Sequence, residues 1–403
     1  MNIFIITNYC QTPSEKGNNR FNYIAQLFSS NGHNVEFITS TFSHRRKQQR
    51  KREEEGLEKL NYKFTMIHEP GYKKNVTPVR FYSHWIFAQN VNKYLNNVEQ
   101  KPDVIYCAVP SLDVAKKVCK YAKKNNIPFI IDIQDLWPEA FQMVFHVPVL
   151  KDILFYTFKR EANYVYSRAD AIVAVSQTYA DRALKVNKMC KTALPVFLGT
   201  DLQYFDDLKK ENTELKNKEK VQLVYIGTLG HSYDLTTTID AVKILEQKGI
   251  DNIELLVMGD GPLKEKFENY ALEKKAKVVF TGRLAYADMV KKLCNCDIAI
   301  NPIAKGAAQS IINKVGDYAA AGLPVINTQE CEEYRNIVKD YNIGLNCNND
   351  DSKDMAEKIY NLYVDVEKRE QMGKNNRKLA EEKFDRKKVY QEILKLVEEK
   401  GNK

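Results

Sequence analysis

Short apolar runs alternate with amphipathic segments along the chain, and this alternation restricts the fold more than any other feature. The first series of runs has four to six residues each and comprises Ile3–Thr7, Val35–Thr39, Val104–Cys107, Phe129–Ile133 and Ala171–Val175. After the polar stretch Asp206–Lys220, a second series comprises Val221–Ile226, Ile253–Met258, Val278–Thr281, Ile298–Ile300 and Pro324–Asn327. Such runs predict strands buried on both faces of a parallel sheet. Two successive series therefore predict an α/β protein with two doubly wound sheets and right-handed crossovers.

The length of 403 residues also favours two domains, because it exceeds what one ordinary core holds. We expect residues 1–198 to form the first domain and residues 199–384 the second, followed by a terminal amphipathic helix within 385–403. In open parallel sheets, ligands bind beyond the carboxyl ends of the strands. Two such sheets facing each other would form a cleft with one ligand on each side. Neither half contains the Gly-x-Gly-x-x-Gly fingerprint of dinucleotide-binding enzymes, which disfavours a nicotinamide or flavin enzyme.

Composition narrows the class of protein. Hydrophobic residues make up 44% and charged residues 28%, as in soluble globular proteins. No apolar run approaches the length of about 20 residues that a membrane span needs, and the segment Met1–Cys10 does not read as a secretory signal. Of the eight cysteines, only Cys294 and Cys296 lie close together, without a second pair or His at metal-ligand spacing. This pattern disfavours a zinc site and predicts a cytoplasmic location.

The formal net charge of +9 has two interpretations, which are attraction to anionic lipids and simple solubility. No aromatic-interleaved basic motif indicates a nucleic-acid partner. The segment His44–Arg52 contains six Lys or Arg residues among nine. Together with the aromatic-rich segment Val149–Tyr166, it could make peripheral contact with the cytoplasmic membrane face. A solvated loop is the alternative interpretation.

The segment Ile312–Ile326 predicts a loop, a helix and a buried strand. Lys314 and Asp317 lie three residues apart and so share one helical face. Gly322 suits a left-handed helix end, and Pro324 prevents the helix from continuing. A cation and a carboxylate at the start of such a helix could hold the phosphate and the ribose of a nucleotide. An ordinary solvated ion pair is the alternative.

Three other strand-end loops in the second half are equipped for a phosphate ligand. In Tyr225–Asp234, Gly227 and Gly230 let backbone amides approach an anion, with His231 beside them. The Gly-Asp-Gly-Pro-Leu string at 259–263 is explained by helix capping and tight turning. In Phe280–Leu284, Arg283 could meet a pyrophosphate or could equally cap a helix.

Two strand-end loops in the first half predict ligand contacts. In Asn8–Arg20, the amides of Gly17 and Asn18 could face a phosphate, and Arg20 could contact the acceptor. The second loop, Asp132–Glu139, combines two carboxylates with an indole ring. Asp135 could orient or deprotonate an acceptor hydroxyl, while Trp137 and Glu139 could bind a sugar. A structural loop with a capping Asp is the alternative.

The segments Ile312–Ile326, Gly259–Leu263 and Asp135–Glu139 together resemble the retaining GT-B glycosyltransferases of family 4, in the branch that assembles O-antigen, capsule and exopolysaccharide. The resemblance implies an acceptor-binding first domain, a nucleotide-sugar-binding second domain and a terminal helix that packs back on the first. It implies transfer from a nucleoside-diphosphate sugar, with uridine expected, to a saccharide hydroxyl on a polyprenyl-linked acceptor. Retention of configuration is also implied, without a metal or another cofactor.

The resemblance assigns site residues and also shows departures. Many family members carry two Glu residues separated by seven, and here Asp317 matches the second and Gln309 the first. Gln309 can bond a sugar hydroxyl but supplies no charge. The Arg and Lys common in the first glycine loop are replaced by Thr228 and Tyr233. The remaining candidates for holding the donor are Gly230, His231, Arg283, Leu284, Lys305, Gly306, Ala307, Ala308 and Lys314.

Two rival functions stay open. A GT-B sugar-nucleotide epimerase would consume the same donor without an acceptor, but it should carry additional carboxylates and His residues. A non-catalytic subunit would use the cleft only to bind sugar or lipid, and the Gln309, Thr228 and Tyr233 departures favour it. Incubation with a panel of nucleotide sugars distinguishes transfer, isomerisation and inertness.

Overall fold

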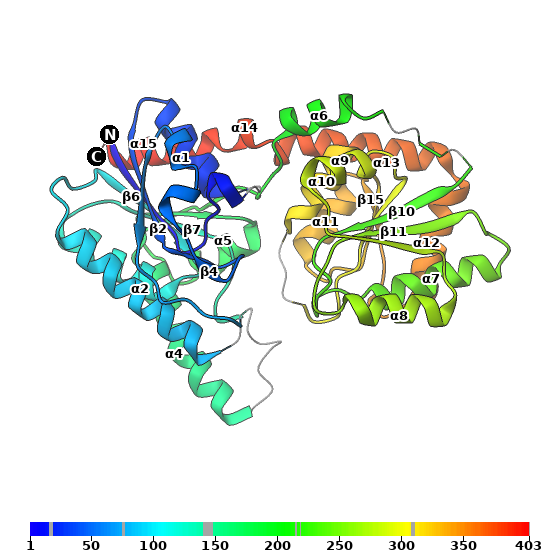
Figure 1. Ribbon diagram of the computed structural model, residues 1–403, viewed down its shortest axis with the longest axis horizontal. Coiled ribbons are helices and arrows are strands. Elements are labelled where there is room, and N and C mark those ends of the chain that lie inside the picture. Colours follow the sequence, from blue (N-terminus) through cyan, green and yellow to red (C-terminus); the bar gives the residue numbers. More distant parts are fainter. Residues whose placement is uncertain are drawn as a thin grey trace. The chain divides into compact units, whose positions relative to one another are not determined.

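The computed structural model describes residues 1–15, 19–74, 77–139, 148–213, 216–217, 219–307 and 311–402, with the backbone alone for 148–154. The chain divides into two compact units, each built around one parallel sheet (Figure 1). The N-terminal unit comprises Met1–Phe197 and Tyr390–Lys403, and the C-terminal unit comprises Leu198–Val389. These limits lie close to the expected 1–198 with 385–403 and 199–384. Which ligand each unit binds stays a prediction.

The sheet of the N-terminal unit has the strand order β5-β2-β1-β6-β7-β8-β9, with all neighbours parallel. From β1 the chain builds outward first through β2 and β5, and then in the other direction through β6. The point where the order reverses is the usual ligand position in such sheets. The strands are β1 (Asn2–Ile6), β2 (Asn34–Ser40), β5 (Lys63–Ile67), β6 (Val104–Val109), β7 (Phe129–Ile133), β8 (Ala171–Ala174) and β9 (Leu194–Pro195).

Helices cover this sheet, and a small antiparallel ribbon of β3 (Phe42–Ser43) and β4 (Gln48–Gln49) follows β2. The C-terminal helix α15 (Gln391–Gly401) packs against α1, β6 and β8 of the same unit. The other helices are α1 (Arg20–Ser30), α2 (Pro78–Asn96), α3 (Leu112–Lys124), α4 (Pro148–Tyr166) and α5 (Gln177–Leu184). Burial of the strands on both faces explains their continuous apolar composition.

The sheet of the C-terminal unit has the strand order β12-β11-β10-β13-β14-β15, again parallel, and its order reverses between β10 and β13. The strands are β10 (Val221–Ile226), β11 (Ile253–Met258), β12 (Val278–Gly282), β13 (Ile298–Asn301), β14 (Val325–Asn327) and β15 (Gly344–Asn346). The helices are α6 (Leu202–Lys210), α7 (Leu235–Gln247), α8 (Lys264–Lys274), α9 (Tyr286–Leu293), α10 (Asn313–Ala321), α11 (Glu332–Asp340), α12 (Ser352–Val364), α13 (Val366–Leu379), the π-helical segment Ala380–Phe384 and α14 (Arg386–Val389).

A ladder of three asparagine side chains, two of them buried, ties three strands of this sheet together at their carboxyl ends. The Nδ2 of Asn301 donates to the Oδ1 of Asn327 at 2.8 Å, and the Nδ2 of Asn327 donates to the Oδ1 of Asn346 at 2.8 Å. Burying a polar group costs little free energy only when the group has a hydrogen-bond partner. The ladder therefore holds the edge from which the candidate loops emerge.

Crossing a lipid bilayer needs a long, strongly apolar helix, and the described parts of the chain contain no such helix.

Candidate functional site

The candidate site of the C-terminal unit is organised by α10, the helix predicted from residues 312–326. The hydroxyl of Tyr318 accepts a hydrogen bond from the Ile226 amide at 3.0 Å and donates to the Ile300 carbonyl at 3.1 Å. This residue locks α10 onto the carboxyl ends of β10 and β13. Gly322 ends the helix with a left-handed φ of 73°, which confirms the predicted stop.

Lys314 lies at the carboxyl end of β10, beneath the turn at Gly227. Its Nζ is 3.9 Å from the centre of the Tyr225 ring and 3.8 Å from that of Tyr233. The side chain is buried, and among the described residues the ammonium has no hydrogen-bond partner. Burial lowers the pKa of Lys314 well below its ordinary value. A buried cation that lacks a partner is unfavourable, and an anionic ligand at the turn would relieve it.

Asp317 has partners of its own and is not an ordinary solvated ion-pair partner of Lys314. Its Oδ1 accepts hydrogen bonds from the Tyr286 hydroxyl at 2.9 Å and from the Thr200 hydroxyl at 3.1 Å. Burial raises the pKa of Asp317 to about 6, against the opposing effect of these two hydroxyls. The alternative interpretation, a solvated pair on a helix surface, is therefore wrong, because both side chains are buried.

The predicted glycine loop after β10 contacts the turn that follows β11. The Gly227 amide donates to the Met258 carbonyl at 3.0 Å, and the Leu229 amide to the Asp260 carbonyl at 3.0 Å. A Cβ on Gly259 would lie 1.9 Å from the Gly227 carbonyl oxygen. The Gly-Asp-Gly string therefore serves close packing of two turns.

A second loop closes on the glycine turn from the other side. The Ala304 amide donates to the Ser232 carbonyl at 3.0 Å, and the Asp234 amide to the Pro302 carbonyl at 2.8 Å. In this way the loops after β10 and β13 meet beside α10. Within them, Gly230 is partly exposed and His231 is exposed.

The loop after β13 continues through Gly306, an exposed residue with a left-handed φ of 72°, and the buried Ala307. The Gly306 amide donates to the Glu330 carboxylate at 2.8 Å. Lys305 is exposed. The predicted sugar contacts Ala308 and Gln309 lie outside the described residues.

Arg283 is exposed at the end of β12, with Leu284 partly exposed beside it. The alternative that Arg283 caps a helix is not realised, because a guanidinium only donates hydrogen bonds and the helix that follows, α9, presents donor amides at its amino end. In the part of the chain that the structure describes, its guanidinium has no protein partner, so it is available to an anion.

In the N-terminal unit, Gly17 and Asn18 lie outside the described residues, and Arg20 requires a correction. Arg20 opens α1 as predicted, but its side chain is buried instead of facing a ligand. Its Nε donates to Asp132 at 2.7 Å, and Nη1 donates to the Val196 carbonyl at 2.9 Å. Removing one partner of a buried ion pair of this kind costs about 3–5 kcal/mol. The residue thus has a structural role.

Two predicted acceptor contacts are also held by protein partners. The ring of Trp137 is 6% exposed and stacks on His84, with the ring centres 6.1 Å apart. Glu139 accepts a hydrogen bond from the Nε of Arg182 at 2.6 Å. The Trp137 ring and one carboxylate oxygen of Glu139 are therefore held by protein partners rather than presented to a ligand.

The carboxylate of Asp135 accepts hydrogen bonds from the side chains of Trp137 and Tyr179. It lies after β7, partly exposed, and its Oδ1 accepts a hydrogen bond from the Leu136 amide at 3.0 Å. Burial raises its pKa above the ordinary value. A carboxyl group with a raised pKa is a stronger base when ionised.

The basic segment His44–Arg52 is internal only in part: Arg50 is buried, whereas Arg45, Lys51 and Arg52 are exposed as the solvated-loop interpretation expects. Arg50 is buried and donates to Glu15 at 3.0 Å and to the Cys10 carbonyl at 2.9 Å. Arg46 pairs with both Glu15 and Glu55. Glu15 and Glu55 therefore neutralise the charges of Arg46 and Arg50, two of the residues for which the sequence suggested membrane contact.

The residues that sequence reasoning missed are mainly tyrosines. Tyr225 and Tyr286 contact Lys314 and Asp317, and Thr200 reaches Asp317 from 117 positions earlier in the chain. Tyr233 was noticed only as a departure from a family pattern, yet its ring lies against the ammonium of Lys314. The sequence offered one indication that Tyr286 belongs to the site: it follows the end of a predicted strand.

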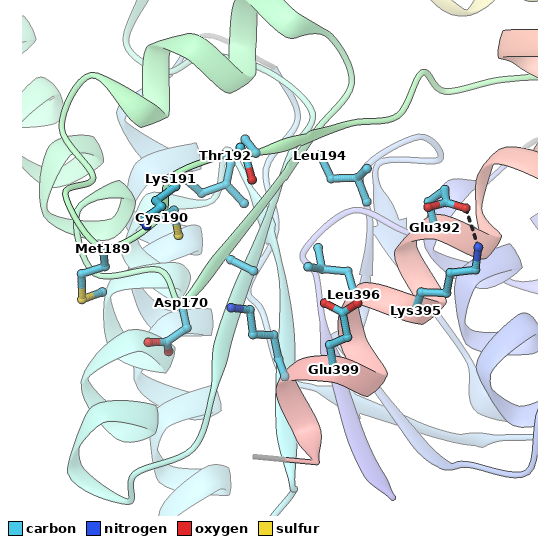
Figure 2. A pocket seen from close by; sticks show the side chains of 14 residues that line it. Asp170, Met189, Cys190, Lys191, Thr192, Leu194, Glu392, Lys395, Leu396 and Glu399 are labelled. Carbon is cyan, nitrogen blue, oxygen red and sulfur yellow. Dashed lines mark hydrogen bonds and ion pairs between the residues drawn. The ribbon is translucent and has the colours of Figure 1, made fainter.

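No group of three or more His, Cys, Asp or Glu side chains is placed to bind a metal ion in the described ranges. A groove of about 390 Å³ in the N-terminal unit lies between α15 and the segment 189–194. Figure 2 shows its charged lining, including the ion pair of Lys395 with Glu392. The groove borders Ala171 at the amino end of β8, so it lies away from the carboxyl edge where the candidate loops gather.

Comparisons with known proteins agree with this architecture. Residues 18–193 match a family model described as Glycosyltransferase Family 4, and residues 206–379 match one described as Glycosyl transferases group 1. A structure of HepE from Anabaena in complex with UDP aligns over 99% of both chains, with a TM-score of 0.72 and 14% identity. This likeness confirms the predicted GT-B fold.

Two curated relatives are bacterial glycosyltransferases. The chain is 24% identical over 250 residues to a Campylobacter jejuni α-1,4-N-acetyl-D-galactosaminyltransferase, covering 61% of this chain and 64% of that protein. It is 23% identical over 236 residues to the capsular polysaccharide biosynthesis glycosyltransferase CapM of Staphylococcus aureus, covering 56% of this chain and 60% of that protein. The chain thus matches less than two thirds of the length of either relative.

Proposed function

The chain belongs to the GT-B glycosyltransferases of family 4, and from this premise we propose that it transfers a sugar from a nucleoside diphosphate to a saccharide hydroxyl. The observation that carries the proposal is Lys314, a buried ammonium without a hydrogen-bond partner among the described residues. It lies against the turn at Gly227, since a Cβ on that glycine would be 3.2 Å from the Lys314 Nζ. The diphosphate of a nucleotide sugar is the ligand that this arrangement fits best.

Lys314 would act on the leaving group. When the bond from sugar to diphosphate breaks, negative charge develops on the phosphate oxygens, and a cation already in place stabilises that charge without reorganisation. The exposed Arg283, directly after β12, would supply a second cation. Asp317 would accept hydrogen bonds from the ribose hydroxyls beside Thr200 and Tyr286.

Structural likeness to Anabaena HepE supports a proposal for the donor nucleotide. Anabaena HepE has been solved with UDP and with UDP-glucose, at 14% identity to this chain. We therefore propose a uridine diphosphate sugar. We propose retention of configuration, with charge compensation by Lys314 and Arg283 in the role that a metal ion fills elsewhere.

The acceptor would be a lipid-linked saccharide. The name of the Campylobacter relative describes an acceptor in which saccharide is joined to undecaprenol through a diphosphate. In this chain, Asp135 is a carboxyl group with a raised pKa that follows β7 of the N-terminal unit. It would orient the attacking hydroxyl, while the departing phosphate oxygen takes its proton.

Peripheral membrane contact is proposed for α2 rather than for the basic segment His44–Arg52. Val79, Tyr82 and Trp85 are 56%, 58% and 48% exposed and lie on one side of α2. Tyr82 and Trp85 stack on each other, with their ring centres 6.3 Å apart. Aromatic residues of this type favour the membrane interface.

The test combines a donor panel with one variant. Purified protein is incubated with nucleotide sugars, with and without lipid-linked saccharide, and release of nucleoside diphosphate is measured. We expect acceptor-dependent release, lowered by about two to four orders of magnitude in Lys314→Met because the charge on the leaving group is no longer compensated. Lys339→Met, which removes an exposed charge on α11, is the matched control and should leave turnover unchanged.

Other outcomes would identify the rivals. Conversion of one nucleotide sugar into another without acceptor would establish the epimerase, and complete inertness with retained binding would establish the non-catalytic subunit. Normal turnover of Lys314→Met would remove Lys314 from the mechanism.

A further inference from the structure

Asp317, the acid proposed to bind the ribose, is held by two hydroxyl groups from distant segments of the C-terminal unit. Both hydrogen bonds end on the same oxygen, since Oδ1 accepts from Tyr286 at 2.9 Å and from Thr200 at 3.1 Å. Among the described residues, no donor bonds to the second oxygen, Oδ2. A carboxylate accepts hydrogen bonds through both of its oxygens, so Oδ2 is left to bind a ligand.

The backbone of Thr200 fixes the position of its hydroxyl. The Thr200 amide donates to the Phe384 carbonyl at 2.7 Å, and the Thr200 carbonyl accepts from the Arg386 amide at 3.2 Å. Gly316, directly before Asp317 in α10, allows this segment to come close, because a Cβ on Gly316 would lie 2.9 Å from the Thr200 Oγ1. Glycine is unfavourable inside a helix, and here it makes room for the hydroxyl that bonds to Asp317.

A second aromatic ring holds Tyr286 in place. Tyr286 is the first residue of α9, and its ring stacks on that of Tyr204 in α6, with the ring centres 6.0 Å apart and the planes 15° apart. Helices α6 and α9 pack against each other. The stack restricts rotation of the Tyr286 ring, so its hydroxyl stays directed at Asp317.

The two hydroxyl groups also favour the ionised form of Asp317. Burial is the largest effect and raises the pKa of Asp317 to about 6, whereas Tyr286, Thr200 and the buried Arg386 each act to lower it. At pH 7 and above, Asp317 is therefore mainly a carboxylate. A carboxylate only accepts hydrogen bonds, and ribose hydroxyls can donate them.

We propose that Thr200 and Tyr286 are positioning residues, which fix the carboxylate of Asp317 through Oδ1 and direct Oδ2 to the ribose hydroxyls of the donor nucleotide. An Asp side chain has two rotatable bonds, and fixing them before the ligand arrives removes an entropy cost from binding. Thr200 and Tyr286 would act on the nucleotide only through Asp317. The identity of the ligand as a ribose rests on the proposed function, whereas the orientation of Asp317 does not.

Calorimetric titration with UDP and with 2′,3′-dideoxyuridine diphosphate tests the proposal. The unmodified chain should bind UDP at least tenfold more tightly, because only UDP has the hydroxyls that donate to a charged acceptor. Thr200→Val has a similar shape but no hydroxyl. It should lower this preference about three- to tenfold and leave the affinity for the dideoxy nucleotide unchanged.

Three further variants separate positioning from general support of the fold. Tyr286→Phe keeps the stacked ring and should lower the preference as Thr200→Val does. Thr200→Ser retains the hydroxyl and should keep the preference of the unmodified chain, as should Tyr204→Phe, the matched control for Tyr286→Phe. If Thr200→Val and Tyr286→Phe weaken binding of both nucleotides by the same factor, or leave both unchanged, the proposal is overturned.

The pH dependence of the preference gives an independent readout. The ratio of the two affinities cancels effects on the diphosphate, which both nucleotides carry. The preference should fall as the pH is lowered through about 6, because Asp317 becomes protonated. In Thr200→Val the midpoint should lie at higher pH, since a group that lowers the pKa of Asp317 is lost. An unchanged midpoint would contradict the role of Thr200.

The outcomes also distinguish this proposal from the proposed function. Equal affinity of the unmodified chain for the two nucleotides would show that the ribose assignment is wrong, and the positioning roles with it. If the preference changes as expected in the variants but no sugar is transferred, the proposed function fails and the positioning roles stand.

Discussion

Lys314 and Asp317 show how burial changes the chemistry of individual residues. Both are ionisable, both lie in the first turns of α10, and both have less than a tenth of their surface exposed. Among the described residues, the Lys314 ammonium lies against aromatic rings without a hydrogen-bond partner, whereas Asp317 has two hydroxyl donors. Hydrogen bonds therefore compensate the burial of Asp317 but not that of Lys314.

The raised pKa of Asp317 makes stability depend on pH. The folded chain holds the proton with a pKa of about 6, whereas an unfolded chain has an Asp pKa of about 4. Below about pH 4 both states are protonated, so Asp317 contributes no pH dependence. As the pH rises from 4 to 6, the unfolded state releases its proton first, and the free energy of unfolding falls by an amount on the order of 3 kcal/mol.

We expect Asp317→Asn to abolish this fall in the free energy of unfolding, because the neutral amide oxygen can still accept hydrogen bonds from Thr200 and Tyr286. The variant should therefore be more stable relative to the unmodified chain at pH 7.5 than at pH 4, as measured by equilibrium denaturation. Asp340→Asn, at an exposed position in the same unit, is the control. The same stability difference at both pH values would contradict the prediction.

At the scale of elements, close contact between turns positions the donor site. The turns at Gly227 and Gly259 share backbone hydrogen bonds, and Tyr318 fastens α10 to β10 and β13. The amide ladder fixes the ends of β13, β14 and β15. Rigid strands and turns therefore hold Lys314 at the carboxyl edge of the sheet.

Gly259→Ala should destabilise the C-terminal unit by about 1–3 kcal/mol, because its Cβ would overlap the Gly227 carbonyl and force the backbone apart. Thermal denaturation measures the effect. Nucleotide binding should weaken as well, since the turn above Lys314 must move.

Gly230→Ala is the matched control for packing. A Cβ there would meet the Thr228 side chain at 3.7 Å, which is an ordinary contact. Stability should be preserved in this variant, while affinity for a UDP sugar falls if the amides of the turn approach the diphosphate. A stable Gly259→Ala protein with normal nucleotide affinity would show that the close contact between turns is not needed.

At the scale of the whole molecule, each unit contains a parallel sheet whose strand order reverses at one point. The C-terminal unit gathers Lys314, Asp317 and the glycine turn at the carboxyl edge of its sheet. In the N-terminal unit, Asp135 follows the carboxyl end of β7. The proposed donor and acceptor contacts therefore belong to different units and can be tested separately.

The exposed side of α2 predicts binding to anionic membranes. The double variant Tyr82→Ser/Trp85→Ser should lower the fraction of protein that floats with phosphatidylglycerol vesicles by about fivefold or more, because both aromatic anchors are lost. Tyr360→Ser removes a comparably exposed tyrosine from the C-terminal unit and should have no effect. Equal flotation of the double variant and the unmodified chain would exclude this surface as the contact.

The elements that could be predicted are those whose sequence pattern depends on residues near one another in the chain. The strands β1, β7 and β10 follow from apolar runs, and the end of α10 follows from Gly322. In the two large sheets, the strands β5, β9 and β15 were not predicted, because β5 includes polar residues and β9 and β15 have only two and three residues. The helix carrying Lys314 and Asp317 was predicted with the right spacing, but the aromatic partners of Lys314 were not.

The sequence alone determined the two βα series, the glycine-containing strand ends and the common face of Lys314 and Asp317, because periodicity and helix stops depend on neighbours along the chain. Tertiary structure alone decided the partners of the charged side chains. Arg20 lies 112 positions from Asp132, and Arg182 lies 43 positions from Glu139. An ion pair is selected by distance and burial in space, which spacing along the chain does not specify.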